Sequence, residues 1–441
     1  MPRSAIVVGA GLAGLTSAYR LQQAGWQVQV LEAAGEVGGR AVSVRKQGYL
    51  FDAGAVGIGT VYKDYMALVD ELGLRDQFVF ASTVSATLRD GRVHEIDSAR
   101  PLTALRSGLL SWRSKLRLVN LFRDLAKIRP QLDIRDVAAA AQFDDESAEA
   151  YALRRLNPEL LEYFIEPMLR TLNLNRASSG ISKLELMNAL AGLFDTQFVT
   201  ILGGVSVFAQ RLAAGLDVRL NCRVQAVQCH ADQVSVDFCD AAGATQSVHA
   251  EVCVIATPLP QALALYPPAR ALYGPLAEVL HYNRGLCVHL GYRAATHTRS
   301  LIVMMPPSEQ PEIALLFLEH NKAPDRAPAG HSMITVFYDE AAIERPWALD
   351  DAALVAQTAA VVERVLPELA GALDMSQVSR WSPGLSNPVQ GVYQAMQVLN
   401  RSVDPRERVQ LVGDYRSTAG QNSAVAWGNN IARDLIRHFP A

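Results

Sequence analysis

The sequence predicts an α/β fold in which two domains are built from interleaved segments of the chain, and three observations lead to this prediction. An apolar run at residues 5–8 ends in the glycine turn "GAGLAG" and is followed by a helical pattern. A β-rich pattern returns only after residue 203, beyond a long helical stretch. Near the C-terminus an apolar strand runs into Gly413 and Asp414 and then into a closing helix.

The N-terminal segment predicts a Rossmann-like βαβ unit. After the strand at residues 5–8 and the glycine turn, "LTSAYRLQQAG" has helical spacing, and a second strand, "WQVQVLE", ends at Glu32. A glycine turn lets the backbone approach a pyrophosphate, and the N-terminus of the next helix supplies N–H groups and a positive dipole. Glu32 is placed to accept hydrogen bonds from a ribose diol. The unit therefore predicts a dinucleotide site.

The middle of the chain changes pattern twice. Residues 61–203 are mostly helical and irregular, with an acidic run, "DDESAE", that we interpret as a solvated surface. The β-rich runs then lie at residues 218–229, 233–239 and 251–258, and further strands are expected in "LCVHLGY", "IALLFLEH" and "SMITVFYDE". A helix is expected at residues 352–366.

Composition limits the class of protein. The chain has 441 residues, a net charge of −3 and 50% hydrophobic residues, which describes a globular protein of about two or three domains without a bias toward nucleic acid. We see neither a signal-peptide pattern nor a long uncharged apolar run, so we expect a cytoplasmic protein. The five cysteines form no CxxC pair and the nine histidines form no HExxH motif, so we expect reduced thiols and no metal site.

The residues after Glu32 indicate which dinucleotide is bound. With the first motif, "AAGEVGGR" at residues 33–40 resembles the flavin-containing amine oxidase superfamily, which includes monoamine oxidases, protoporphyrinogen oxidases and the phytoene desaturase group. The resemblance continues in four further stretches along the chain: "FDAGAVG" at residues 51–57, "LGGVSVFAQRLAAG" at 202–215, "NCRVQAV" at 221–227 and "GDYRSTAGQNSAVAWG" at 413–428.

The resemblance implies bound FAD. In that family the second motif helps to hold the pyrophosphate, and the "FDAGAVG" loop packs against the flavin ring. The resemblance implies that Ser423, Ala424 and Val425 start the last helix beneath the pyrimidine end of the flavin, where a helix N-terminus stabilises negative charge. The FAD is expected to be non-covalent, because the first histidine is His94 and the last cysteine is Cys287, so no FAD motif carries the usual anchor. The residues assigned to FAD in this way are Gly9, Ala10, Gly11, Leu12, Ala13, Gly14, Glu32, Ala33, Gly38, Gly39, Arg40, Gly54, Ala55, Val56, Val224, Gly413, Asp414, Ser423, Ala424 and Val425.

The same resemblance divides the chain between two domains. The FAD-binding domain is expected to take residues 1–60, 203–270 and 391–441. A substrate-binding domain of mixed sheet plus helices is expected to take residues 61–202 and 271–390.

The sequence departs from the amine oxidases at two positions. Those enzymes usually carry a lysine on a strand of the substrate domain, and in this chain the aligned residue is Leu286. They often place an aromatic residue before the last FAD motif, where this chain has Gly420. Both departures weaken the expectation of amine oxidation.

Other features resemble the remaining branches of the superfamily. "GDY" resembles the phytoene desaturase form of the last motif, and "YFIEPMLRTLNL" at residues 163–174 resembles a protoporphyrinogen oxidase segment. No catalytic residue is identified, and the cavity candidates are Trp381, Leu286 and Arg284. The stretch "HYNR" at residues 281–284 either faces substrate or caps a strand.

We therefore expect an FAD-dependent oxidoreductase, an oxidase or desaturase that removes hydride from a C–H bond of a hydrophobic or cyclic organic substrate to flavin N5. Because no second GxGxxG unit is present, the electrons are expected to pass to dioxygen or a quinone-like acceptor. Three alternatives stay open: an amine oxidase that forms an imine, a non-redox flavin-dependent isomerase, and a flavin-binding scaffold without activity. The oligomeric state is left open.

The basic stretch at residues 100–129 predicts an amphipathic helix. It holds eight basic residues and one acid, Asp124. Its apolar residues recur at three- and four-residue steps, at Leu109, Trp112, Leu116, Val119 and Phe122. We expect this stripe to pack on the substrate domain of the protein itself. The alternative is peripheral contact with a membrane or a lipid-like substrate.

Overall fold

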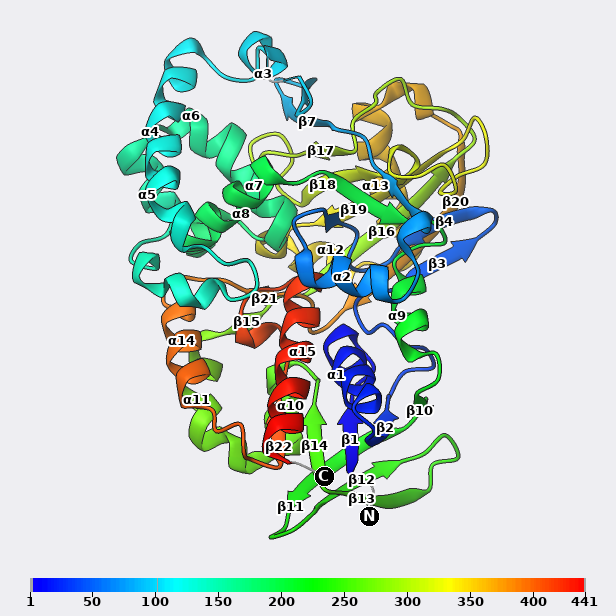
Figure 1. Ribbon diagram of the computed structural model, residues 1–441. Coiled ribbons are helices and arrows are strands. Elements are labelled where there is room, and N and C mark those ends of the chain that lie inside the picture. Colours follow the sequence, from blue (N-terminus) through cyan, green and yellow to red (C-terminus); the bar gives the residue numbers. More distant parts are fainter. Residues whose placement is uncertain (1–2, 101, 440–441) are drawn as a thin grey trace.

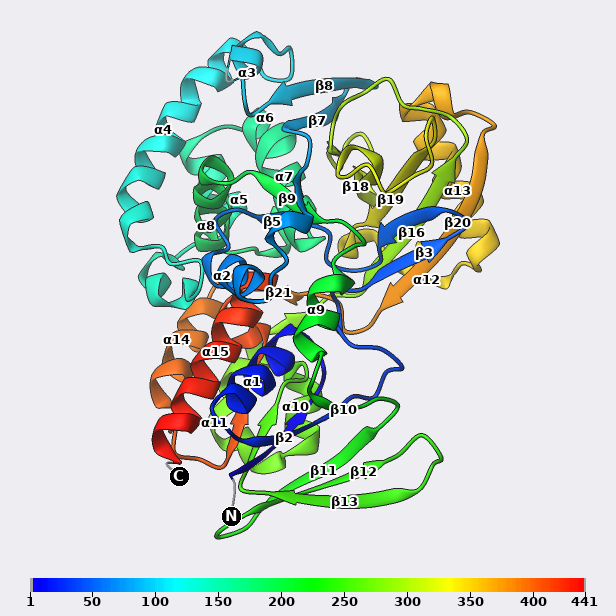
Figure 2. The same ribbon diagram turned by 45° about the vertical axis from the view of Figure 1, so that its right-hand side comes forward.

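The computed structural model describes residues 3–100 and 102–439, and it confirms the α/β class with a Rossmann-like part. The molecule has two lobes, with a parallel sheet in the lower lobe and a larger mixed sheet beside a group of helices in the upper lobe (Figure 1). Both ends of the described chain lie at the base of the lower lobe (Figure 2).

The parallel sheet collects strands from distant parts of the chain. Its five strands run in the order β10-β2-β1-β14-β22. Ala5 and Val7 of β1 point into one hydrophobic core, whereas Ile6 and Val8 point into another, so the strand is buried on both faces. The bounds are β1 (Ser4–Val8), β2 (Gln27–Leu31), β10 (Asp217–Arg219), β14 (Val252–Ile255) and β22 (Val409–Leu411).

Helices cover one face of this sheet, and a second sheet with further helices covers the other. The helices of the first face are α1 (Leu12–Gln23), α2 (Lys63–Glu71), α9 (Ser206–Ala213) and α15 (Gln421–His438). The elements of the second face are β11 (Arg223–Cys229), β12 (Val234–Cys239), β13 (Thr245–Ala250), α10 (Leu259–Leu265), α11 (Arg270–Val279) and α14 (Val392–Ser402). Helices α1 and α15 cross closely at Gly428, where an added Cβ would lie 2.7 Å from the Ala13 carbonyl oxygen.

The upper lobe is built on a seven-stranded sheet in the order β20-β16-β19-β18-β17-β7-β8. Helix α13 (Asp351–Val365) covers one face of this sheet and confirms the expected helix. The strands are β7 (Val84–Arg89), β8 (Arg92–Asp97), β16 (Gly285–Tyr292), β17 (Ile302–Met304), β18 (Ile313–Leu318), β19 (Ser332–Tyr338) and β20 (Leu373–Trp381). The hairpin of β7 and β8 lies within the stretch that was expected to be helical, so that expectation was wrong there.

Small paired strands link the lobes, and a helical group flanks the large sheet. The small strands are β3 (Ser43–Lys46), β4 (Tyr49–Asp52), β5 (Ile58–Gly59), β6 (Phe78–Phe80), β9 (Phe198–Ile201), β15 (His281–Tyr282) and β21 (Ser386–Asn387). The helices are α3 (Leu102–Arg106), α4 (Trp112–Ile128), α5 (Ala148–Arg155), α6 (Pro158–Leu160), α7 (Glu166–Asn173), α8 (Lys183–Asp195) and, beside the large sheet, α12 (Glu344–Ala348).

The predicted amphipathic helix exists as α4, but its apolar stripe does not pack as expected. Trp112 is 66% exposed and Leu116 is 58% exposed, and only Leu109 of the stripe is buried. The helix packs instead through Leu121, Leu125 and Ile128, which join the core formed with α5 and α8. The expectation that the stripe packs on the protein itself was therefore wrong. Pro101 of this stretch lies outside the described residues.

The division into two domains at the segments given above stays a prediction. Within residues 3–100 and 102–439, no helix has the length and apolar character needed to cross a membrane.

Candidate functional site

The glycine turn after β1 shows why two of its glycines are needed and why the third is not needed by the fold itself. Gly9 has φ +99°, which favours glycine. At Gly14 an added Cβ would lie 2.1 Å from the Gly9 carbonyl oxygen, so α1 packs directly on the turn. Gly11 has an ordinary φ of −72°, and an added Cβ there would meet no described atom within 4 Å. Gly11 therefore presents bare backbone on an open surface at the N-terminus of α1.

Glu32 holds the turn in place. Its carboxylate accepts hydrogen bonds from the backbone N–H of Ala10 at 2.6 Å and of Ala34 at 2.7 Å. The Cys222 N–H donates to the Glu32 carbonyl oxygen at 2.7 Å, which places the start of β11, and hence Val224, beside the end of β2.

The "GGR" segment lies directly against the glycine turn. The Gly38 N–H donates to the Ala10 carbonyl at 2.8 Å, and an added Cβ on Gly39 would lie 3.2 Å from the Gly11 Cα. Gly38 has φ +115° and Gly39 has φ +59°. The two segments predicted to hold the pyrophosphate are therefore brought together.

Arg40 joins this segment to two distant parts of the chain. Its Nη1 donates to the Gly384 carbonyl at 2.6 Å and to Asp414 Oδ2 at 2.9 Å, and Asp414 Oδ1 accepts from the Tyr282 hydroxyl at 2.7 Å. Burial alone would lower the pKa of Arg40, but Asp414 and Tyr282 outweigh it and raise that pKa. Burial and Asp414 both raise the pKa of Tyr282 well above its ordinary value.

The loop at residues 53–56 lies at the boundary between the lobes. The Ala55 N–H donates to the Arg40 carbonyl at 2.9 Å, and an added Cβ on Gly54 would lie 2.1 Å from the same oxygen. Trp381 Nε1 donates to the Ala53 carbonyl at 2.8 Å. Val56 packs against the apolar cluster that contains Cys287 of β16. The loop thus faces an apolar side of the large sheet.

Helix α15 begins at Gln421, two residues before the predicted start, because Gly420 serves as its N-cap. Gln421 Nε2 donates to the Gly57 carbonyl at 2.9 Å, which ties the helix to the same loop. Three buried polar atoms near these segments have no partner among the described residues: Gln421 Oε1, Asn422 Nδ2 and Thr257 Oγ1. Unpaired buried polar atoms and the bare backbone at Gly11 fit a large polar ligand such as FAD.

The three cavity candidates have different surroundings. Trp381 lies at the loop, as described above. Leu286 is fully buried between the sheet and α13, on the opposite face from Cys287, so it does not face the loop. Arg284 pairs with Glu344 at 2.6 Å and lies 5.4 Å from the centre of the Trp347 ring. The structure therefore brings Trp381 to the candidate site, whereas the side chains of Leu286 and Arg284 have other surroundings; the choice of cavity residues stays a prediction.

The "HYNR" stretch has a structural role in linking segments. His281 and Tyr282 pair with β21, and Asn283 Nδ2 donates to the Asn173 carbonyl at 2.8 Å. Asn283 Oδ1 also accepts from the Leu385 N–H at 2.7 Å. The end of α7 is thereby connected to the segment that contacts Arg40.

Sequence reasoning missed two buried polar groups, of which Asp52 directly precedes the loop. Asp52 is fully buried with Lys322 and Arg326, and those two cations outweigh the effect of burial and lower the pKa of Asp52. Glu185 of α8 is 5% exposed and accepts a 2.5 Å hydrogen bond from the Tyr393 hydroxyl. Both groups join residues far apart in the chain, so no local motif marks them.

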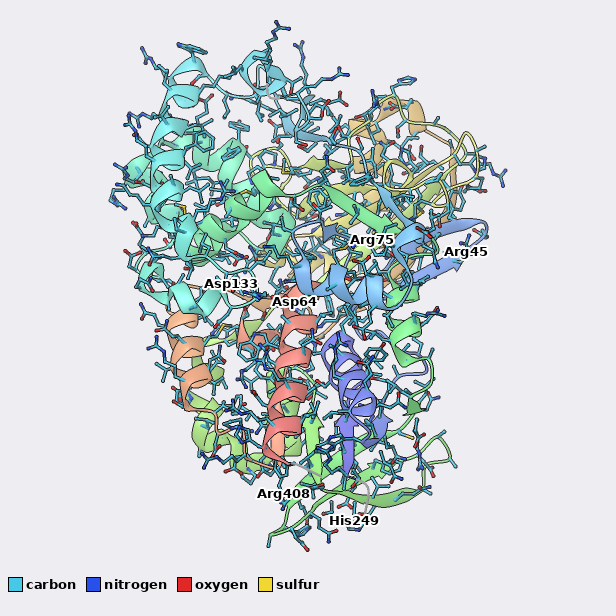
Figure 3. The ribbon with its side chains drawn as sticks, in the orientation of Figure 1. Arg45, Asp64, Arg75, Asp133, His249 and Arg408 are labelled. Atoms are coloured by element: carbon cyan, nitrogen blue, oxygen red, sulfur yellow. The ribbon has the colours of Figure 1, made fainter. Side chains whose placement is uncertain are left out.

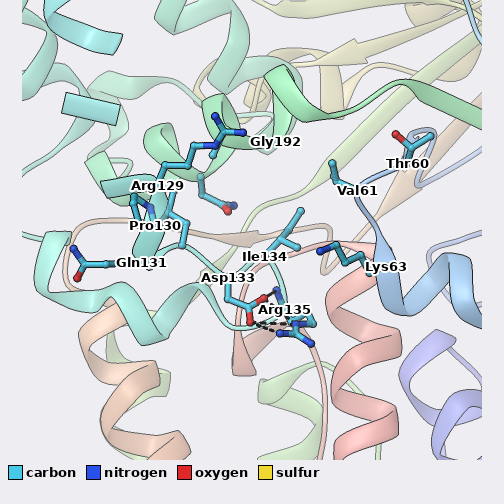
Figure 4. A pocket seen from close by; sticks show the side chains of 13 residues that line it. Thr60, Val61, Lys63, Arg129, Pro130, Gln131, Asp133, Ile134, Arg135 and Gly192 are labelled. Carbon is cyan, nitrogen blue, oxygen red and sulfur yellow. Dashed lines mark hydrogen bonds and ion pairs between the residues drawn. The ribbon is translucent and has the colours of Figure 1, made fainter. Parts of the chain in front are cut away.

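A cavity of about 830 Å³ opens beside the candidate site (Figure 4). Its lining comes from the start of α2, the segment after α4 and one face of α8, and consists of Thr60, Val61, Lys63, residues 129–135, Asn188, Ala191 and Gly192. Asp133 also lines a second, smaller pocket together with Asp64, and both residues are labelled in Figure 3. Burial raises the pKa of Asp64, and Asp133 adds to the effect although Arg135 opposes it. Ser423 Oγ donates to the Ile134 carbonyl at 3.5 Å, which links the cavity wall to the start of α15.

Comparison with known proteins gives one family. A family model described as "Flavin containing amine oxidoreductase" matches residues 12–436. Protoporphyrinogen oxidase 2 of Arabidopsis thaliana is 32% identical over 165 residues, which are 37% of this chain and 31% of that protein. An L-amino-acid oxidase of Siganus canaliculatus is 27% identical over 293 residues, which are 63% of this chain and 54% of that protein.

The matched part of the chain thus spans about a third to a half of the length of these curated relatives. Among solved structures, cyclohexylamine oxidase from Brevibacterium oxydans has a TM-score of 0.78 at 17% identity, with 99% of this chain and 100% of that chain covered. At this identity the likeness shows the shared fold. Because the family model matches nearly the whole sequence, the chain belongs to the flavin-containing amine oxidoreductase family.

Proposed function

We propose that this protein is an FAD-dependent oxidoreductase that oxidises a C–H bond of a hydrophobic or cyclic organic molecule. The observation that carries the proposal is the position of the loop at residues 53–56. On one side it continues into the paired glycine segments, and on the other it faces the apolar side of the large sheet with Cys287, Phe317 and Phe337. A cofactor ring held at this loop would meet an apolar substrate on that side.

The residues that would hold FAD come from four segments. The bare backbone of Gly11 and the N–H groups of α1 suit the pyrophosphate, and Glu32 suits the ribose diol. Arg40 and Asp414 would hold the ribityl-phosphate part, and the first turn of α15 would lie at the pyrimidine end. When bound, FAD supplies a two-electron acceptor. The full assignment of residues to FAD, including Ala33, Val224, Ala424 and Val425, stays a proposal.

The chain itself supplies positioning and a dry environment. The apolar side of the large sheet excludes water from the side of the loop where substrate would lie, and Trp381 fixes the loop through Ala53. His289, on the same strand as Cys287, has its pKa lowered to about 3 by burial, so it stays neutral and takes no part as a cation at neutral pH. We propose dioxygen or a quinone-like molecule as the electron acceptor.

Anaerobic mixing of the yellow holoprotein with a panel of cyclic and hydrophobic compounds tests this function. Stoichiometric bleaching of the flavin absorption band by one of them supports oxidation. Product without net bleaching, seen only after prior reduction, would support the isomerase alternative. Retention of FAD without either result across the panel would leave the scaffold alternative.

We also propose that the stripe of α4 contacts an anionic lipid surface. Trp112, Leu116 and Val119 are exposed, and so are Leu102 and Leu105 of the neighbouring α3. The one acid of the stretch, Asp124, is paired with Arg155 at 2.8 Å, which leaves the region strongly basic. An apolar stripe flanked by arginines is typical of helices that lie in a membrane interface.

A further inference from the structure

We propose that the carboxyl of Glu185 and the side-chain amide of Asn173 form a buried polar site between the 830 Å³ cavity and the flavin-binding segments, and that this site binds an uncharged oxygen acceptor of the substrate, such as a carbonyl. This inference rests on the proposed function, because it concerns the same hydrophobic substrate and specifies the polar group that this substrate carries.

The helix that lines the cavity carries Glu185 on the same face as two of the lining residues. Asn188 and Gly192 of α8 line the 830 Å³ cavity, and Glu185 precedes them by three and seven residues, which puts all three on one helical face. Tyr62, between the lining residues Val61 and Lys63, lies close enough to Glu185 for that carboxyl to raise its pKa further, after the larger effect of burial. Glu185 and Tyr62 are not among the lining residues, so they lie directly behind this wall of the cavity.

The same carboxyl also lies close to the flavin-binding segments. Thr418, three residues before the start of α15, is within interaction range of the Glu185 carboxyl. Asn173, at the end of α7, is tied through its carbonyl to Asn283, and Asn283 holds the segment whose Gly384 carbonyl accepts from Arg40. The two side chains thus lie between the open cavity and the candidate cofactor site.

The chemistry of the pair favours an uncharged partner. Among residues 3–100 and 102–439, no Lys or Arg forms an ion pair with Glu185. Burial without a cation disfavours a carboxylate, because its charge loses the solvation of water, so the neutral form is favoured. Burial raises the pKa of Glu185, and Tyr393, Asn173 and Thr418 offset this only in part. A protonated carboxyl has one O–H to donate.

Asn173 supplies the second donor. It is 5% exposed, and its Nδ2 is buried without a partner in the described part of the chain. It lies near enough to Glu185 to influence the pKa of that carboxyl, but not at hydrogen-bonding geometry. An unpaired buried donor is costly, so a ligand that brings an acceptor there gains affinity. Two donors at one buried site suit a carbonyl and do not suit an ammonium group.

Two probes of nearly equal shape separate these possibilities. Cyclohexanone offers an acceptor, whereas cyclohexylamine is a cation at neutral pH. Each is titrated into the FAD-loaded protein, and binding is followed by the change in the visible flavin spectrum. We expect cyclohexanone to bind more tightly than cyclohexylamine. We expect Glu185→Ala and Asn173→Ala each to weaken cyclohexanone binding about tenfold, the value of one lost hydrogen bond.

Glu185→Gln gives a readout that a merely structural role would not produce. The amide keeps a donor in the same place, so it should retain cyclohexanone binding to within about threefold. Binding to the wild type should weaken as pH rises through the pKa of Glu185, because the donor is then lost, whereas binding to Glu185→Gln should not change. The other titratable groups that face this carboxyl are Tyr62 and Tyr393, with Asp144 behind Tyr393.

Glu149→Gln on α5 is the matched control, since Glu149 lies in the first turn of α5 and is not among the groups that act on the Glu185 carboxyl. The proposal would be overturned in favour of a cationic substrate if cyclohexylamine bound more tightly than cyclohexanone and if Glu185→Gln and Glu185→Ala weakened cyclohexylamine binding equally. Unchanged binding of both probes in Glu185→Ala and Asn173→Ala would overturn it as well. If FAD is retained in these cases, only this inference fails; a purified protein that cannot bind FAD would refute the proposed function itself.

Discussion

Replacement of Gly11 by alanine should separate FAD binding from folding. Nothing among the described atoms lies within 4 Å of the position that the new Cβ would take, and the φ of −72° is ordinary for alanine. Alanine lowers the entropy of the unfolded chain, which stabilises by about 0.4–1 kcal/mol, but it is a poorer N-cap than glycine. These effects oppose each other, so the free energy of unfolding of the FAD-free protein should change by less than about 1 kcal/mol.

The same methyl group would stand on the surface that we assign to the pyrophosphate. Forcing an extra methyl into a packed contact costs about 1–3 kcal/mol, which raises the dissociation constant of FAD roughly five- to 150-fold. FAD titration by fluorescence, together with thermal unfolding of the FAD-free protein, measures both quantities. Gly14→Ala is the contrast, because its Cβ would lie 2.1 Å from the Gly9 carbonyl oxygen and should destabilise the fold itself. Wild-type FAD affinity in Gly11→Ala would refute the assignment of this surface.

Four further predictions concern the cofactor, the substrate and the surface. Glu32→Ala should weaken FAD binding roughly ten- to a hundredfold, because a charge-assisted hydrogen bond is worth about 1.5–3 kcal/mol. The carboxylate also accepts hydrogen bonds from the Ala10 and Ala34 N–H groups, and an unchanged dissociation constant of FAD would contradict the prediction. FAD should be released by acid precipitation, whereas colour that stays in the pellet would indicate a covalent bond. Simple primary amines should be turned over poorly in a peroxide assay, since no lysine occurs on β16, and efficient oxidation of benzylamine would restore the amine oxidase alternative. Binding of the protein to liposomes should rise with the content of anionic lipid, fall with salt concentration and drop in the double variant Arg113→Gln with Arg123→Gln. If none of these three changes alters binding, α4 does not contact a lipid surface.

The parts of the site that follow a local pattern could be predicted from the sequence. The strand, glycine turn, helix and acid at Glu32 lie within about thirty residues, the usual extent of a βαβ unit, and the structure brings the later "GGR" segment against them. The closing helix was placed two residues late because the alignment, unlike the N-cap geometry of Gly420, did not define its start.

The position of Leu286 shows why the sequence alone does not decide which residue of β16 faces the loop. Side chains alternate between the two faces of a strand, so a shift of one residue in the alignment moves a side chain to the other face. Leu286 packs under α13, and its neighbour Cys287 faces the loop. A strand of eight buried residues has no polar alternation that could have decided the register from sequence.

Long-range pairs were beyond prediction, but the missed hairpin was not. Tyr393 and Glu185 are 208 residues apart, and no motif connects them. Strands β7 and β8, by contrast, are joined by Asp90 and Gly91, both with positive φ. An Asp-Gly pair between alternating residues is a recognised hairpin signal, and it could have identified these strands within the helical stretch.

A crystal structure of the protein purified with its yellow cofactor tests the central claim most directly. The account predicts FAD with its pyrophosphate against Gly11 and Gly39, its ribose hydroxyls at Glu32, and its ring between the loop at residues 53–56 and the β16 face that carries Cys287. FAD bound elsewhere, or a ring turned away from that apolar face, would contradict it.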